Sequence, residues 1–435
     1  MTPETIGIVG IILLLVLIFL RFPVGLSLFI VGFIGIGLIN GWEVSFNQLA
    51  STAFSVVNNY GLSVIPLFIL MGLYLSYSGF GKDMFNAVDK CLGHFRGWLA
   101  LACIGAGAIF AAISGSTNAS TATLARVAIP EMSRFNYQLS LSTASVAAGG
   151  TLGILIPPSV ILVLYGAMTN EPIGPLLIAG IIPGLLLTLF FMLTINLWVR
   201  RDPTVAPLNP NPVPVWERFL SMKQIWPFLV IFVMSIGGIY FGWFTPTEAG
   251  GIGAMAAFLT SVFSRRITWQ KLSDSLGEAL RITAMIFIIL VGASVFGKFL
   301  ALSRIPMQLS SFVAGLEVSE YVILVLILIM YMILGMFLEG IAILVLTLPI
   351  VYPLIIDLGF DGIWFGVIMV MMLNIGLLTP PLGLSVYIIS GVVREIPIQA
   401  IFRAVLPMLF TMIIFTVILV LFPEIVTFLP ELSRQ

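Results

Sequence analysis

The sequence alternates between long apolar segments and short polar stretches, and the apolar segments approach the length needed to cross a bilayer. A spanning helix needs roughly 20 mostly apolar residues, and such segments recur along the chain. The pattern predicts ten full spans and two re-entrant hairpins. In the first half we expect spans at 5–20, 24–41, 61–80, 138–170 and 174–199, and a hairpin at 98–130. In the second half we expect spans at 224–242, 246–264, 280–300, 363–392 and 398–422, and a hairpin at 321–356.

A polar segment divides these spans into two halves. Residues 200–223 carry several charges and prolines, and proline cannot continue a helix. We therefore expect a first inverted repeat at 1–200, a cytoplasmic linker at 201–223 and a second inverted repeat at 224–435.

Composition agrees with a membrane protein. Of the 435 residues, 60% are hydrophobic and 9% are charged, whereas soluble chains carry about 25% charged residues. The net charge is zero, so charge indicates no nucleic-acid partner. Cys91 and Cys103 are too few for a disulfide framework or a metal cluster. The N-terminal segment carries Glu4 and no basic region, so we interpret it as a retained span.

The basic residues predict the orientation, because cytoplasmic loops carry an excess of Lys and Arg. With the N-terminus outside and both hairpins re-entrant, all but three of the 19 Lys and Arg residues lie on or near the cytoplasmic side. The exceptions are Lys298, Arg304 and Arg434. Both termini are therefore expected outside.

The two halves share a motif, Gly-x-x-x-Pro-Pro. It occurs at Gly153 in GGTLGILIPPSV and again 223 residues later at Gly376 in NIGLLTPPLGLSV. Pro23 and Pro246 have the same separation. Repeated landmarks in one order indicate internal duplication. Since each half has five full spans, the repeats insert with opposite orientations, as in secondary transporters.

Each Pro pair is expected to break its helix within the membrane. Proline lacks an N–H and displaces the preceding turn, so several carbonyls lose their helix partners. Free carbonyls in lipid are tolerated where they line a cavity. Together with a hydroxyl they suit Na⁺, a hard cation that prefers oxygen ligands. A simple kink is the alternative for either motif alone, and the matched pair favours cation binding.

The centres of both hairpins hold residues that are unusual in an apolar segment. Small residues there can serve helix packing, but hydroxyls and amides can also face an ion or an anion. A carboxylate at membrane depth usually has a function, and Glu339 could bind a proton, pair with a cation or shape the tip. The first centre contains Ser114, Gly115, Ser116, Thr117, Asn118 and Ser120, and the second contains Gly335, Glu339 and Gly340.

Other polar features receive structural interpretations. Glu248 in TPTEAG is expected to cap a helix, and His94, the only histidine, is expected to be structural. Four amphipathic segments are expected at the interface: 82–98 and 267–281 on the cytoplasmic face, and 42–61 and 306–321 on the outer face.

Several functions other than a Na⁺-coupled carrier remain open. A proton-coupled carrier using Glu339 is the nearest rival, followed by a carrier that needs no binding protein. An intramembrane enzyme would need an activated nucleophile or a metal, and the sequence has neither a His-Glu-x-x-His motif nor a second histidine. A channel suits paired broken helices less well than alternating access does. No P-loop motif for ATP hydrolysis occurs.

At the two Gly-x-x-x-Pro-Pro motifs, SGSTNAS and TPTEAGGIG, the sequence resembles the large membrane subunit of tripartite ATP-independent periplasmic (TRAP) transporters over nearly its whole length. The resemblance implies an elevator-type, all-α polytopic fold without enzymatic activity. It implies a bacterial or archaeal inner-membrane location with both termini periplasmic. The implied partners are a separate small four-helix subunit and a periplasmic substrate-binding protein. The implied function is Na⁺-driven uptake of a carboxylate or sulfonate, of unspecified identity.

The resemblance also implies site residues. The substrate is expected between the hairpin tips, near Ser116, Thr117, Asn118, Glu339 and Gly340. Two Na⁺ sites are expected, the first at Ser114, Asn118, Gly153, Ile156 and Pro158 with Ser116 nearby, and the second at Gly335, Gly376, Thr379 and Leu382. Ile156 occupies the position of Thr379, so the first site lacks that hydroxyl and must depend on Ser114 or Asn118.

Overall fold

The structure, a computed structural model, describes residues 2–208, 214–223, 225–315, 318–393 and 396–433. Across these ranges the chain is helical and contains no strand. Within the described residues, five helical segments are long and apolar enough to cross a membrane, and eight shorter apolar helices accompany them. The prediction of an all-α polytopic membrane protein is confirmed.

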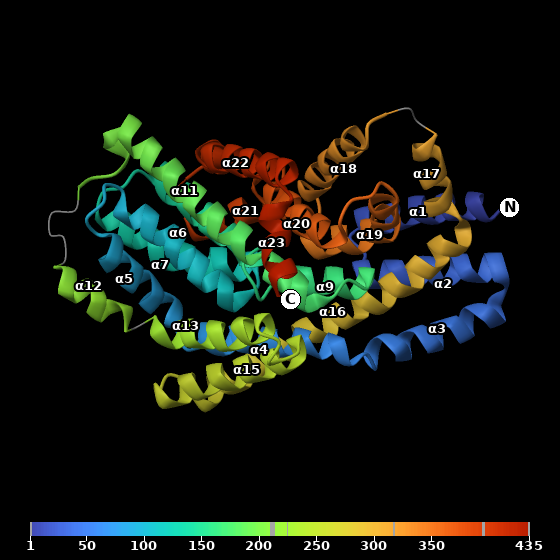
Figure 1. Cartoon of the computed structure of the whole chain (residues 1–435), viewed down its shortest axis with the longest axis horizontal. Helices are drawn as coiled ribbons and strands as arrows, with labels where there is room; N and C mark the ends of the chain where they lie inside the picture. The colour runs from blue at the N-terminus through green and yellow to red at the C-terminus, as the bar shows by residue number, and fades with distance from the viewer. Residues whose placement is uncertain (1, 209–213, 224, 316–317, 394–395, 434–435) are drawn as a thin grey trace.

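The helices follow one another along the chain as shown in Figure 1. The first half contains α1 (Pro3–Phe19), α2 (Val24–Asn40), α3 (Trp42–Val57), α4 (Val64–Tyr77), α5 (Phe80–Leu92), α6 (Trp98–Ser114), α7 (Thr117–Arg134), α8 (Leu139–Thr151), α9 (Val160–Thr169), α10 (Ile173–Ala179) and α11 (Ile181–Arg201). The second half contains α12 (Val215–Met222), α13 (Trp226–Phe232), α14 (Gly238–Tyr240), α15 (Pro246–Phe263), α16 (Trp269–Ser303), α17 (Ile305–Ala314), α18 (Glu320–Gly335), α19 (Gly340–Asp357), α20 (Gly362–Leu378), α21 (Leu384–Val392), α22 (Ile398–Leu421) and α23 (Glu424–Leu432).

Both predicted hairpins are pairs of contacting helices, α6 with α7 and α18 with α19. Gly115 ends α6 with a φ of 59°, a left-handed conformation that glycine adopts readily. Ser116 then caps α7, because its hydroxyl accepts a hydrogen bond from the N–H of Ala119. The first tip therefore falls within the polar cluster that the sequence indicated.

Both Gly-x-x-x-Pro-Pro motifs interrupt the helix in which they lie, as predicted. The first break separates α8 and a short 3₁₀ turn, Leu152–Ile154, from α9, and the second separates α20 from α21. Both Pro–Pro peptide bonds are cis. At the first break the Ser159 hydroxyl donates to the carbonyl of Ile154 at 2.6 Å and accepts from the N–H of Leu162. The Ser159 side chain thus gives a hydrogen-bond partner to one backbone carbonyl at the break and to one backbone N–H in the first turn of α9.

Helices from the two halves pack in a crossed pattern. α2 packs on α16 while α15 packs on α4, and α7 contacts α21 while α9 contacts α19. The 223-residue offset relates α2 to α15, α4 to α16, α7 to α19 and α9 to α21. Each contact is therefore the counterpart of another, as expected for inverted repeats.

Glycines bring α2 and α16 into backbone contact. A Cβ on Gly32 would lie 2.8 Å from the backbone nitrogen of Phe296, and one on Gly292 would lie 2.2 Å from the carbonyl oxygen of Gly25. Small residues at membrane helix interfaces permit this close packing. We call α2, α4, α15 and α16 the scaffold.

Two predicted boundaries need correction. The interfacial segment 267–281 and the span 280–300 form one helix, the 35-residue α16. No proline separates them, and Gly277 alone does not end the helix. The linker 201–223 is not wholly irregular, since it contains a 3₁₀ turn at Pro203–Val205 and the helix α12. Residues 209–213 of the linker lie outside the described residues.

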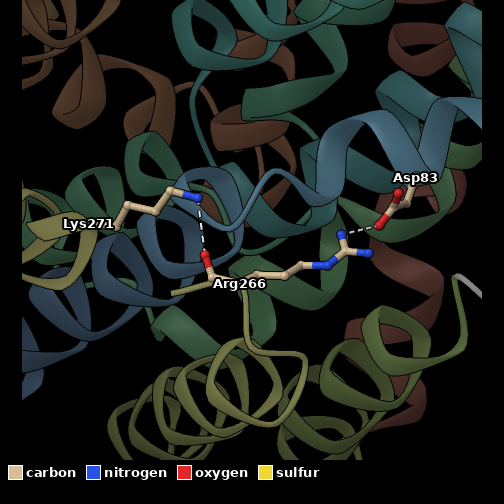
Figure 2. A network of polar contacts seen from close by, with 3 residues as sticks. All are labelled: Asp83, Arg266 and Lys271. Carbon is tan, nitrogen blue, oxygen red and sulfur yellow. Dashed lines mark hydrogen bonds and ion pairs between the residues drawn. The ribbon is translucent and has the colours of Figure 1, made fainter. Parts of the chain in front are cut away.

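A polar network fastens α5 to the scaffold (Figure 2). Arg266, between α15 and α16, pairs with Asp83 of α5. Its guanidinium also lies 4.5 Å from the centre of the Phe80 ring. The backbone carbonyl of Arg266 accepts a hydrogen bond of 3.1 Å from Lys271 Nζ. The network thus connects α5, which precedes the first hairpin, to the loop between the scaffold helices α15 and α16.

Arg266→Ala is expected to lower the thermal unfolding midpoint by about 2 °C, because a half-exposed ion pair and a cation–π contact together contribute about 1 kcal/mol. Lys82→Ala removes an exposed charge from the same helix and should leave the midpoint unchanged. Thermal denaturation of the purified protein in detergent measures both. Equal effects of the two substitutions would show that the network does not fasten α5.

Candidate functional site

A cavity of about 370 Å³ lies where the two hairpin tips meet the scaffold. Residues 114–119 of the first tip and residues 339–341 of the second line it. Ile154 and Leu377, each next to a helix break, also line it, and one face each of α4 and α16 forms the remaining wall. The family resemblance implied five residues near the substrate, and all five border one cavity: Ser116, Thr117, Asn118, Glu339 and Gly340.

The first tip packs against the first helix break. A Cβ on Gly115 would lie 2.5 Å from the carbonyl oxygen of Pro158, and one on Gly153 would lie 2.8 Å from the carbonyl oxygen of Ser116. Ser114 Oγ lies 2.8 Å from Ser120 Oγ. The structure thus brings together four residues of the predicted first cation site or its surroundings, namely Ser114, Ser116, Gly153 and Pro158.

The other two residues predicted for the first cation site, Asn118 and Ile156, do not direct their side chains into the contact between the tip and the break. Asn118 lines the cavity, and no contact places it at the break. The Ile156 side chain is directed toward α11, because a Cβ on Gly184 would lie 2.5 Å from Ile156 Cγ1. Ile156 can therefore offer only backbone atoms to a cation, as its apolar side chain requires.

The second break has a matching backbone contact. A Cβ on Gly376 would lie 2.4 Å from the Cα of Gly335, so the end of α18 touches the end of α20. The Thr379 hydroxyl donates to the carbonyl of Ile375 at 2.6 Å, and this leaves its oxygen free to accept or to coordinate. The Leu382 side chain is exposed, with 44% of its surface accessible. Gly335, Gly376 and Thr379 thus gather at the second break.

The residues predicted to hold a cation at the two breaks can offer oxygen atoms as ligands. Among the described residues, no group of three His, Cys, Asp or Glu side chains could hold a metal ion. Backbone carbonyls with one or two hydroxyls suit a hard alkali or alkaline-earth cation and disfavour a transition metal. The donor set therefore fits the expected Na⁺.

The cavity presents features that suit an anion. α7 begins at Thr117 and α19 begins at Gly340, so two helix N-termini meet the cavity, and helix N-termini attract negative charge. Thr117 is buried, and its hydroxyl has no hydrogen-bond partner in the part of the chain that the structure describes. Glu339 is the N-cap residue of α19, but its side chain makes no capping hydrogen bond within the described residues. Among the described residues that line the cavity, none is Lys, Arg or His.

Sequence reasoning missed the scaffold wall of the cavity. Ser76 of α4 and Glu278 and Met285 of α16 line it, and Glu278 lay in a segment interpreted as interfacial. The polar Ser76 and Glu278 at the edge of apolar helices were the available signal. The structural interpretation of Glu248 is confirmed, since it forms a capping box with Thr245. His94 is exposed and contacts Arg218, and its structural role stays a prediction.

The sequence of residues 11–425 matches the family described as "Tripartite ATP-independent periplasmic transporter, DctM component". A C4-dicarboxylate TRAP transporter large permease protein from Pseudomonas aeruginosa is 36% identical over 390 residues, covering 89% of this chain and 90% of that protein. The sialic acid TRAP transporter large permease protein of Vibrio cholerae is 33% identical over 418 residues, covering 96% of each.

A solved structure shares the fold. The crystal structure of the YdaH transporter from Alcanivorax borkumensis superposes with a TM-score of 0.64, covering 89% of this chain and 90% of that one at 14% identity. The relatives are named as transporter permeases and not as enzymes. The chain belongs to the DctM family of tripartite ATP-independent periplasmic transporters and is a multi-pass membrane permease.

Proposed function

We propose that the protein carries out Na⁺-coupled uptake of a small organic anion by an elevator movement. The observation that carries the proposal is a cavity that both hairpin tips border, next to two helix breaks whose predicted ligands are oxygen atoms. Broken helices paired in this way are the usual binding elements of secondary transporters.

The two cations would bind at the breaks and travel inward with the substrate. Ser114, Gly153, Ile156 and Pro158 would hold the first, with Asn118 completing the site. Gly335, Gly376, Thr379 and Leu382 would hold the second. Each site joins a hairpin tip to a broken helix, so cation binding would order the tips that face the substrate. Linkage then requires that the substrate raise Na⁺ affinity by the same factor.

The anion would lie between Ser116, Thr117 and Asn118 on one side and Glu339 and Gly340 on the other. Since no basic side chain of the described residues lines the cavity, helix N-termini, the Thr117 hydroxyl and the cations would balance its charge. The names of the relatives indicate C4-dicarboxylates and sialic acid. We propose a carboxylate or sulfonate of this size range as the substrate.

The hairpins and broken helices would move together against the scaffold. Backbone contacts between α2 and α16 keep the scaffold rigid, while the cavity lies at its boundary with the tips. A small membrane subunit and a periplasmic substrate-binding protein would complete the transporter. The chain would lie in the bacterial or archaeal inner membrane with both termini periplasmic, as its basic residues suggest.

Na⁺ is expected to stabilise the purified protein. At a concentration 100 times its dissociation constant, a ligand adds about 2.7 kcal/mol to the free energy of unfolding. We expect the unfolding midpoint to be higher in NaCl than in KCl of equal ionic strength. Thr379→Ala should reduce this difference. Thr169→Ala, which removes a similar hydroxyl bonded to the carbonyl four residues earlier, should leave it intact.

The same measurement addresses the proton-coupled alternative. Glu339 borders the cavity, so a carrier that used it would respond to pH and not to Na⁺. A midpoint indifferent to Na⁺ in the wild type would contradict the proposed coupling and favour Glu339 as the site of a transported proton.

A further inference from the structure

The scaffold face that lines the cavity is polar at one end only. Its members recur every three or four residues, and so they share one face of each helix. On α4 they include Ile69, Leu73 and Ser76, and on α16 they include Met285, Ile282 and Glu278. Within each row the side chains are apolar except at one end, which is Ser76 on α4 and Glu278 on α16. We call Ser76 and Glu278 the polar mouth of the cavity.

The charge distribution places the polar mouth toward the cytoplasm. Ser76 lies at the last turn of α4, just before Lys82 and Lys90 of α5. Glu278 lies near the start of α16, which follows Arg265 and Arg266. Clustered basic residues mark the cytoplasmic side. A substrate leaving the tips for the cytoplasm would pass this end of the scaffold face.

Glu278 is held in place at the mouth. Its side chain is half-buried, and the Tyr77 hydroxyl donates a hydrogen bond to Oε2. No described Lys, Arg or His lines the cavity, and Arg281, one turn further along α16, is exposed and lies outside it. An anion in the mouth would therefore face a fixed negative charge without a basic partner in the cavity.

We propose that Glu278 determines the direction of release, by weakening the binding of the anion from the cytoplasmic side. The proposal rests on the proposed function. Glu278 belongs to the scaffold and stays in place, so it repels the anion only when the tips face the cytoplasm. A unit charge about 10 Å away in a medium between protein and water changes affinity about three- to fivefold.

The test measures substrate affinity separately on the two sides. The whole complex, with small subunit and binding protein, is reconstituted in proteoliposomes and supplied with succinate, sialic acid or a short sulfonate, whichever the wild type takes up. Internal substrate inhibits uptake, and its half-inhibitory concentration reports affinity on the cytoplasmic side. Glu278→Gln should lower that concentration about three- to fivefold and leave the external KM unchanged.

Two variants separate charge from structure. Glu278→Asp keeps the negative charge and should show the wild-type internal half-inhibitory concentration. Asp274→Asn removes an exposed carboxylate one turn earlier on α16, outside the cavity, and should change nothing. The proposal would be overturned if Glu278→Gln shifted the internal half-inhibitory concentration and the external KM equally, or if it left the internal half-inhibitory concentration unchanged. A wild type inactive with all three anions would instead count against the proposed function.

A labelling experiment tests the position of the mouth without any substrate. Ser76→Cys is made after replacing Cys91 and Cys103, and a membrane-impermeant maleimide is applied to vesicles of either orientation. Labelling from the cytoplasmic face supports the proposal. Labelling only from the outer face would place the polar mouth at the entrance and exclude a role for Glu278 in release.

Discussion

Gly376→Ala is expected to reduce Na⁺-dependent uptake at least about tenfold. The new Cβ would lie 2.4 Å from the Cα of Gly335, and two backbones cannot accommodate it without moving apart. Both glycines belong to the proposed second cation site, so the shift would displace its carbonyl ligands. Alanine favours helix by about 1 kcal/mol over glycine, so a purely local effect would stabilise α20.

A matched glycine serves as the control. Gly391 lies in α21, and a Cβ there would meet no atom of the described residues within 4 Å. Gly391→Ala should retain wild-type uptake. Both variants are first compared with the wild type by size-exclusion chromatography, so that loss of transport is measured on folded protein. Full uptake by Gly376→Ala would show that the contact of α18 with α20 does not position the cation.

Ser114→Ala is expected to raise the half-saturating Na⁺ concentration by about tenfold. The first break has Ile156 where the second has Thr379, so a hydroxyl must come from the hairpin tip. Ser114 is close to Ser116, Gly153 and Pro158 through the packing of the tip on the break. Loss of one oxygen ligand or hydrogen bond to a charged group changes binding by about 1.5 kcal/mol or more.

The Na⁺ dependence of uptake at saturating substrate measures this effect. Ser133→Ala, at the exposed far end of α7, is the matched control and should behave like the wild type. An unchanged Na⁺ dependence in Ser114→Ala would remove this hydroxyl from the first site and leave Asn118 as its side-chain ligand.

The sequence predicted those features that depend on local chemistry. Pro157–Pro158 and Pro380–Pro381 cannot continue a helix, so the breaks follow directly from residue type. The polar tip at 114–120 contrasts with its apolar surroundings, and Glu248 lies at the spacing of a capping box. The division into repeats at 1–200 and 224–435 and the roles of the cation ligands remain predictions.

Features that depend on packing could not be predicted. Membrane helices are apolar on most faces, so periodicity does not tell which side of α4 or α16 meets the hairpins. Glu278 was therefore interpreted as part of an interfacial segment, although it borders the cavity. The unbroken α16 was missed because the change from amphipathic to apolar character at 280 suggests a boundary, whereas the backbone has no reason to stop there.

The most direct test of the central claim is uptake by the complete transporter in proteoliposomes. Wild type and Thr379→Ala are compared with an inward Na⁺ gradient, with a proton gradient, and with neither, in the presence and absence of the binding protein. The proposed function predicts uptake by the wild type that requires both Na⁺ and the binding protein and weakens in Thr379→Ala. Uptake driven by the proton gradient and indifferent to Na⁺ would contradict it.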